Sequence, residues 1–229
     1  MANGNSIRDE IKEQQQKMMQ ENGIRGRISY FFFYYKVHLI IALILIAVVI
    51  TTVFNILTQK DVVLQVAFVN GFPNQSSEEF MGNFEKSISL DTKHQETFMD
   101  DSFYIASENP SVYDDQNNQK FLIMAGANQI DVCVADNTYF ESIANAGYFT
   151  DLSTILTAEQ LARYKDNLYY FDSPNDDYDG EVIAGIRVSD AAKIVSTKSF
   201  PNTDAYFGII INSSNIENAV AFLEYLETP

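Results

Sequence analysis

Residues 130–155, IDVCVADNTYFESIANAGYFTDLSTI, decide the fold class of the larger part of the chain. The run 130–135 is apolar and β-rich, which is typical of a strand buried on both faces of a parallel sheet. Asp136 is a good N-cap for a helix with one apolar side, and Gly147 is suited to end that helix. A strand that leads directly into a capped, amphipathic helix predicts a β–α unit.

The same alternation extends through the rest of residues 58–229. Strands are expected at 62–69, 103–107, 130–135, 182–187 and 206–211. Helices are expected after Ser76, Asp136, Thr157 and Ser214, each of which is a potential N-cap, and over 115–126. Alternating strands and helices predict an α/β domain with a mainly parallel sheet and helices on both faces.

A second stretch, SYFFFYYKVHLIIALILIAVVITTVF at 29–54, raises the question of a membrane anchor. The apolar region 37–57 has 21 residues, and at ~1.5 Å per residue a helix of that length covers about 31 Å, close to the ~30 Å hydrocarbon core of a bilayer. The run is apolar all round, unlike most core helices. It starts too late for a cleaved export signal and no A-x-A site follows it. We therefore expect an uncleaved transmembrane helix.

The distribution of basic residues predicts the orientation of the chain in the membrane and its division into three segments. Arg25, Arg27 and Lys36 precede the apolar run closely, whereas Lys60 is the only basic residue close behind it. The positive-inside rule predicts a cytoplasmic N-terminal segment at 1–36, a transmembrane helix at 37–57 and an extracytoplasmic α/β domain at 58–229 of a single-pass cell-membrane protein.

The external domain is strongly acidic. Residues 61–229 carry a net charge of −19, which argues against nucleic acid as a partner because that ligand needs a basic surface. The single cysteine, Cys133, forbids an internal disulfide and lies in an apolar run, so we expect a small buried side chain there. No cofactor motif or metal site of the His-rich or Cys-rich kind is present in the sequence.

Two stretches resemble the extracellular solute-binding proteins of bacterial ABC transporters. In 130–155 a strand of the form D-V-x-x-x-D is followed by a helix and by A-x-x-G-x-F-x-D-L-S; in 205–226 a strand precedes A-x-x-F-L-x-x-L. The matching residues are Asp131, Val132, Asp136, Ala144, Gly147, Phe149, Asp151, Leu152, Ser153, Ala219, Phe222, Leu223 and Leu226.

The resemblance implies the fold of a solute-binding protein and a link to ABC transport. Family members usually have two lobes with the ligand between them, whereas this domain has room for about one lobe and is anchored by a transmembrane helix instead of a lipid. The expected function is therefore a non-catalytic accessory or scaffold domain that binds a protein partner, for example an ABC permease. The alternative is capture of a small solute for an ABC transporter.

A small-molecule site in an α/β domain lies beyond the carboxyl ends of the strands. The candidate ligand contacts there are polar or aromatic: Asn70, Phe72, Ser107, Asp136, Asn137 and Tyr139. Each has a structural alternative, since an asparagine can shape a turn, an aspartate can cap a helix and a ring can belong to the core.

The sequence gives only weak signals for a calcium site or a catalytic site. The acidic stretch DSPNDDYDGE at 172–181 suggests calcium, but an EF-hand would need a glutamate where Ile186 stands, and a solvated turn is the expected alternative. No G-x-S-x-G, P-loop or G-x-G-x-x-G motif occurs, and His94 is the only histidine outside 1–60. We expect no enzymatic activity, no catalytic residue and no cofactor.

Overall fold

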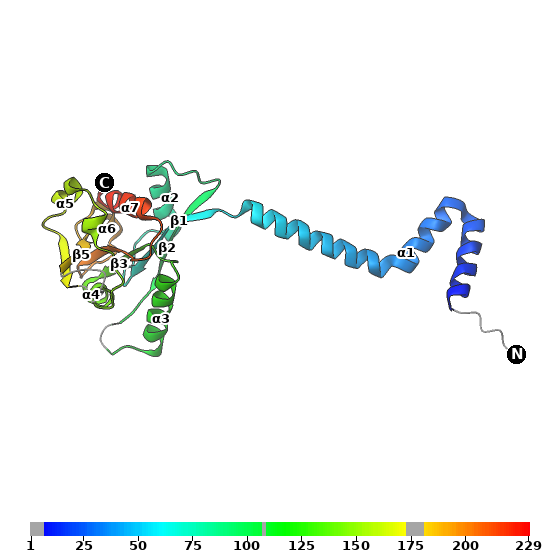
Figure 1. Cartoon of the computed structure of the whole chain (residues 1–229), viewed down its shortest axis with the longest axis horizontal. Helices are drawn as coiled ribbons and strands as arrows, with labels where there is room; N and C mark the ends of the chain where they lie inside the picture. Colours follow the sequence, from blue (N-terminus) through cyan, green and yellow to red (C-terminus); the bar gives the residue numbers. More distant parts are fainter. Residues whose placement is uncertain (1–6, 107–108, 173–180) are drawn as a thin grey trace. The chain divides into compact units, whose positions relative to one another are not determined.

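A computed structural model describes residues 7–106, 109–172 and 181–229. The chain divides into two compact units, residues 1–59 and residues 60–229. The first contains a single long helix, and the second contains a sheet covered by helices (Figure 1).

Helix α1 spans Ile7–Thr58 and contains one non-helical residue, Gly23, with φ 51° and ψ −131°. Glycine adopts this conformation without a Cβ clash, so the helix bends there. The next glycine, Gly26, causes no such break, and the helix runs through it. Residues Tyr34–Ile56 have a mean hydropathy of 2.9 and are long and apolar enough to cross a membrane.

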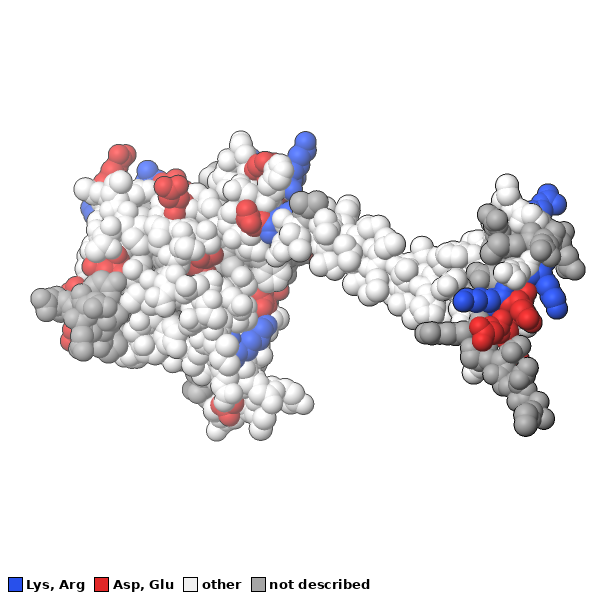
Figure 2. All heavy atoms as spheres, turned by 45° about the vertical axis from the view of Figure 1, so that its right-hand side comes forward, with Lys and Arg blue, Asp and Glu red and all other residues white. Residues whose placement is uncertain are grey.

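The apolar part of α1 carries no charged side chain between Lys36 and Lys60, and Figure 2 shows an uncharged surface along it. Two of its threonine hydroxyl groups are paired within the helix. Thr51 Oγ1 donates to Ala47 O at 2.9 Å, and Thr58 Oγ1 donates to Phe54 O at 2.8 Å. Hydroxyl groups that are paired within their own helix are compatible with hydrocarbon, where water is absent.

The second unit is built on a six-stranded sheet with the order β2-β1-β3-β6-β5-β4. Its strands are β1 (Asp61–Val69), β2 (Gln95–Phe103), β3 (Val132–Asp136), β4 (Leu168–Asp172), β5 (Glu181–Arg187) and β6 (Ala205–Ile209). Strand β1 pairs in parallel with β2 and β3, whereas β3–β6, β6–β5 and β5–β4 are antiparallel.

The prediction of a mainly parallel sheet therefore holds only for the half β2-β1-β3. Helical crossovers connect β1 to β2 and β2 to β3, and parallel strands need such connections. Only eight residues separate β4 from β5, too few for a crossover, so this pair is antiparallel. The correct fold class is α/β with a mixed sheet.

Helices cover both faces of the sheet, as expected. One core cluster packs α2 (Ser77–Ser87), α6 (Ala192–Thr197) and α7 (Ile216–Glu227) on one face, and the other packs α3 (Val112–Gly126) and α4 (Asn137–Asn145) on the opposite face (Figure 1). The short helices η1 (Leu152–Thr154) and α5 (Ala158–Arg163) lie between α4 and β4 in the sequence. All residues of both clusters belong to the second unit.

Local signals located most helices correctly. Side chains of Ser76, Asp136 and Thr157 cap α2, α4 and α5, and Gly147, with φ 74°, follows the end of α4. The proposed cap at Ser214 was wrong, because α7 begins after Asn215, which makes no side-chain cap bond.

The strand expected at 103–107 was also wrong, because β2 ends at Phe103. Strand β4 and helix α6 were not predicted. Strand β2 was missed because it lies at the edge of the sheet and keeps many polar residues, so its sequence lacks an apolar run.

Candidate functional site

The candidate site lies at the carboxyl ends of β1 and β3. These strands are neighbours, with Val69 paired to Ala135, so Asn70 and Asp136 follow them side by side. Strand β2, which follows β1 in the sequence, lies on one side of β1. Strand β3, which comes next, lies on the other side of β1. The strand order therefore reverses between β1 and β3, which is where open α/β sheets bind ligands.

Two of the predicted ligand contacts bind each other at this point. Asn70 Nδ2 donates to Asp136 Oδ2 at 2.6 Å and to Ile105 O at 3.0 Å, and Asn70 Oδ1 accepts from Ile105 N at 2.8 Å. The other oxygen of Asp136 accepts from Tyr139 N at 2.8 Å and caps α4. Asn70 also has φ 58°, a conformation that asparagine tolerates better than most residues. Asn70 and Asp136 thus connect three segments of the chain.

An exposed aromatic pair lies beside this connection. The rings of Phe72 and Tyr104 are 5.9 Å apart, and each residue is 54% exposed. Their backbones are held in place, because Phe72 N donates to Ser199 O at 2.7 Å and Asn117 Nδ2 donates to Tyr104 O at 2.9 Å. The result is an apolar surface on a fixed backbone.

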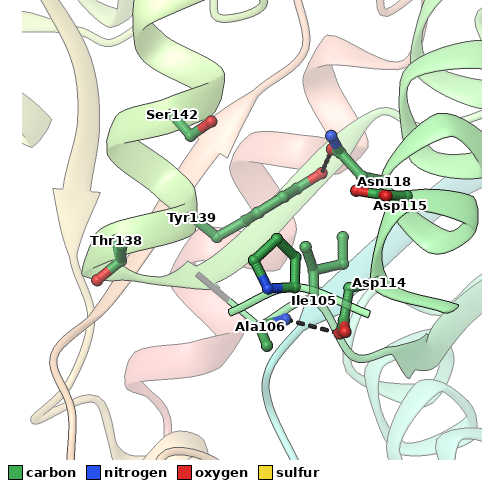
Figure 3. Close-up of a pocket in the computed structure, with 9 residues that line it drawn as sticks. Ile105, Ala106, Asp114, Asp115, Asn118, Thr138, Tyr139 and Ser142 are labelled. Atoms are coloured by element: carbon green, nitrogen blue, oxygen red, sulfur yellow. Dashed lines mark hydrogen bonds between the residues drawn. The ribbon is translucent and has the colours of Figure 1, made fainter. Parts of the chain in front are cut away.

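A cavity of about 260 Å³ opens between α3 and α4 (Figure 3). Ile105 and Tyr139 are buried in its wall, whereas Asp115 and Ser142 are exposed at its rim. The other residues that line it are Ala106, Pro110, Asp114, Asn118 and Thr138. Apolar and polar groups therefore face the same small space.

Tyr139 is held rigidly in this cavity. Its hydroxyl donates to Asn118 Oδ1 at 3.0 Å, and its ring meets Phe121 edge-on at 5.5 Å (Figure 3). Burial raises the pKa of the Tyr139 hydroxyl above its ordinary value, so the group remains a neutral hydrogen-bond donor. This side chain provides an aromatic wall of constant orientation.

Asp114 forms the base of the cavity and stays charged. It is buried, and its carboxylate accepts from Ala106 N at 2.8 Å, Ser111 N at 2.7 Å and Ser111 Oγ at 2.5 Å. These bonds, that of the Ala106 N–H first, hold the pKa of the Asp114 carboxyl below its ordinary value. Asp114 therefore fixes the start of α3 and adds a negative charge behind the cavity.

The structure thus separates the six predicted contacts. Asn70 and Asp136 join each other, Phe72 contributes to the aromatic pair, and Tyr139 lines the cavity. Asn137 is the exposed first residue of α4, and its backbone N–H donates to Asp204 O at 3.1 Å. Ser107 lies outside the described residues.

Sequence reasoning missed Tyr104, Asp114 and Asn118. One local signal was available, since Ser111 and Asp114 have the spacing of a capping box and form one. Nothing in the sequence pairs Asn118 with Tyr139, because these residues belong to different helices that meet only in the folded domain.

The buried Asp131, which directly precedes β3, has a structural role. Its carboxylate accepts from Gln65 N at 2.8 Å, Ser213 Oγ at 2.7 Å and Asn215 Nδ2 at 3.1 Å. These bonds connect β1 to the segment before α7, so this first aspartate of the D-V-x-x-x-D pattern serves the fold.

In the described part of the chain, little supports a metal site or a reactive thiol or imidazole group. Within it, no group of three or more His, Cys, Asp or Glu side chains is placed to hold a metal ion. Residues 173–180 of the suggested calcium loop lie outside the described residues. Cys133 is fully buried, which raises the pKa of its thiol, and His94 is exposed beside Asp91 at 2.8 Å.

Comparisons with protein families, with curated proteins and with solved structures found no match.

Proposed function

We propose that this protein is a membrane-anchored, non-catalytic accessory or scaffold component whose α/β domain binds a protein partner. One observation carries the proposal: at the ligand-binding edge of the sheet, Asn70 and Asp136 are hydrogen-bonded to each other, whereas Phe72 and Tyr104 expose their rings. A polar solute at this point would have to break existing bonds. A protein surface can cover the rings without such a loss.

The energetics favour this kind of contact. Aromatic residues are enriched at protein interfaces, and Tyr in particular is common among the residues that contribute most to affinity. The backbones of Phe72 and Tyr104 are already hydrogen-bonded, so little backbone conformational entropy remains to be lost when a partner binds. The net charge of −19 on residues 61–229 favours a partner with a basic rim around an apolar centre.

The proposal places the protein in a bacterial cell membrane through α1, with residues 1–36 in the cytoplasm and the α/β domain outside. The basic residues that precede the apolar helix support this orientation. Surface digestion of intact cells tests it: a protease should remove an epitope at the C-terminus and leave one at the N-terminus intact. The reverse pattern would overturn the orientation.

The proposal also treats the domain as related to one lobe of a solute-binding protein, which makes an ABC permease a natural partner. The β–α alternation, the capping role of Asp136 and the turn at Gly147 support this relationship. They are shared with many α/β domains, so the partner has to be found by experiment.

Matched double variants test the partner contact. In the full-length protein, Phe72→Ala with Tyr104→Ala should reduce recovery of the partner at least tenfold in quantitative affinity purification from native membranes. Phe98→Ala with Tyr170→Ala is the control, because these residues are 50% and 52% exposed. Equal losses from both variants would contradict a specific contact at Phe72 and Tyr104.

Capture of a small solute for an ABC transporter is the second candidate function. The cavity between α3 and α4 supports it, because buried and polar groups converge there on a space large enough for a small molecule.

A further inference from the structure

We propose that the cavity between α3 and α4 binds a small organic cation, an ammonium group attached to a short apolar body. This inference gives the second candidate function a ligand class. It does not depend on the partner contact at Phe72 and Tyr104, which involves different residues.

Among the described residues that line the cavity, the charged side chains are all negative. Asp114 and Asp115 contribute carboxylates, and no lysine or arginine is among the described residues that line it. The oxygens of Asp114 are taken by N–H and O–H donors, so this residue supplies negative potential. The carboxylate of Asp115 is exposed, and within the described residues it has no hydrogen bond or ion pair. Asp115 is therefore the group that can bind a cation directly.

The polar atoms are arranged for a donor ligand. Figure 3 shows the side chains of Asp115 and Asn118 extending from α3 toward Tyr139 on α4. Asn118 Oδ1 accepts one hydrogen bond from Tyr139 and has a second lone pair. An ammonium group has three donors and no acceptor, so it can donate to Asp115 and Asn118 together.

The remaining wall suits an apolar body. Ile105 and Pro110 line the cavity together with the ring of Tyr139, whose orientation is fixed by its hydrogen bond and by Phe121. A cavity of about 260 Å³ limits the ligand to a compact molecule. The net charge of −19 on residues 61–229 attracts cations and repels anionic ligands of the same shape.

Three probes of similar shape and different charge test the proposal: 2-phenylethylammonium, 2-phenylethanol and 3-phenylpropionate. Binding to the full-length protein in detergent is measured by saturation-transfer NMR titration. The cation should bind at least tenfold more tightly than the alcohol, and the anion should give no saturable signal. Equal affinities for all three probes, or no saturable binding of the cation, would overturn the proposal.

The variant Asp115→Asn locates the site. It keeps the size of the side chain and removes the charge, so the affinity for 2-phenylethylammonium should fall at least tenfold. The control is Asp166→Asn, which removes an exposed aspartate that does not line the cavity. Unchanged affinity in Asp115→Asn, or the same loss in both variants, would refute the site.

The two proposals can fail separately. Asp115→Asn should leave recovery of the protein partner unchanged, and the double variant at Phe72 and Tyr104 should leave the cation affinity unchanged. If cation binding is lost while the partner contact stays intact, the result therefore bears on the cavity proposal alone.

Discussion

Substitution of Asn70 by alanine tests whether the polar groups at the carboxyl ends of β1 and β3 are structural. Alanine removes both hydrogen bonds with Ile105 and the bond to Asp136. It also places a residue with an ordinary Cβ at φ 58°, where asparagine is better tolerated. We expect a large loss of stability because both the side chain and the backbone conformation are affected.

The magnitude follows from these two contributions. The two neutral hydrogen bonds with Ile105 contribute about 1 kcal/mol each to stability. The hydrogen bond to the carboxylate of Asp136 contributes ~1.5–3 kcal/mol. Asn70 is half-buried, so rehydration reduces this sum to roughly 2–3 kcal/mol. The left-handed backbone adds about 1 kcal/mol for alanine and nothing for glycine. Asn70→Ala should therefore cost ~3–4 kcal/mol and Asn70→Gly ~2–3 kcal/mol.

Urea unfolding of residues 60–229, whose core is formed by its own residues, measures this loss by circular dichroism. With a slope of about 2 kcal/mol per molar, the midpoint should fall by roughly 1.5–2 M in Asn70→Ala. The control is Asn128→Ala, because Asn128 has φ 57° and is exposed, so only the backbone cost of about 1 kcal/mol applies. If Asn70→Ala costs no more than Asn128→Ala, the structural role assigned to Asn70 is wrong.

Four further predictions concern the core and the cavity. Asp131→Ala leaves the donors of three residues without an acceptor and should cost about 3–5 kcal/mol in the same urea assay; a cost below 1 kcal/mol would contradict its role. Gly208→Ala places a Cβ 2.6 Å from the ring of Phe149, so roughly 1–3 kcal/mol should be lost, and an unchanged midpoint would argue against this packing. The pKa of Asp114 is lower in the folded state, so its stabilisation is complete above the ordinary value of about 3.9 and is lost as the pH falls through the folded value. Asp114→Asn should accordingly flatten the fall in stability below about pH 4, and identical acid profiles would exclude this role. The thiol of Cys133 should react with a disulfide reagent only after unfolding, since burial raises its pKa; rapid labelling of the native protein would show that it is accessible.

Local patterns were sufficient for the elements with strong signals. The run 62–69 was predicted as a strand from its apolar character and forms most of β1. The caps Ser76 and Thr157 located two helices because the geometry of a cap depends on residues close in sequence. Strand direction depends on which strands become neighbours, and the sequence contains no local signal for the antiparallel position of β6.

The candidate site was predictable only in part for the same reason. The rule that ligands bind at the carboxyl ends of strands brought Asn70 and Asp136 into consideration, but their mutual hydrogen bond is a long-range contact. Tyr139, one of the predicted contacts, lines the cavity, whereas its partner Asn118 comes from a helix whose position relative to α4 cannot be inferred from periodicity.

Photo-crosslinking in living cells tests the central proposal most directly. A photoreactive phenylalanine analogue is placed at position 72 of the full-length protein, and the same analogue at position 98 is the control, because Phe72 and Phe98 are 54% and 50% exposed. A protein partner at the aromatic pair predicts one discrete adduct from position 72 and none of that mass from position 98. No adduct at position 72, or the same adducts at both positions, would contradict the account.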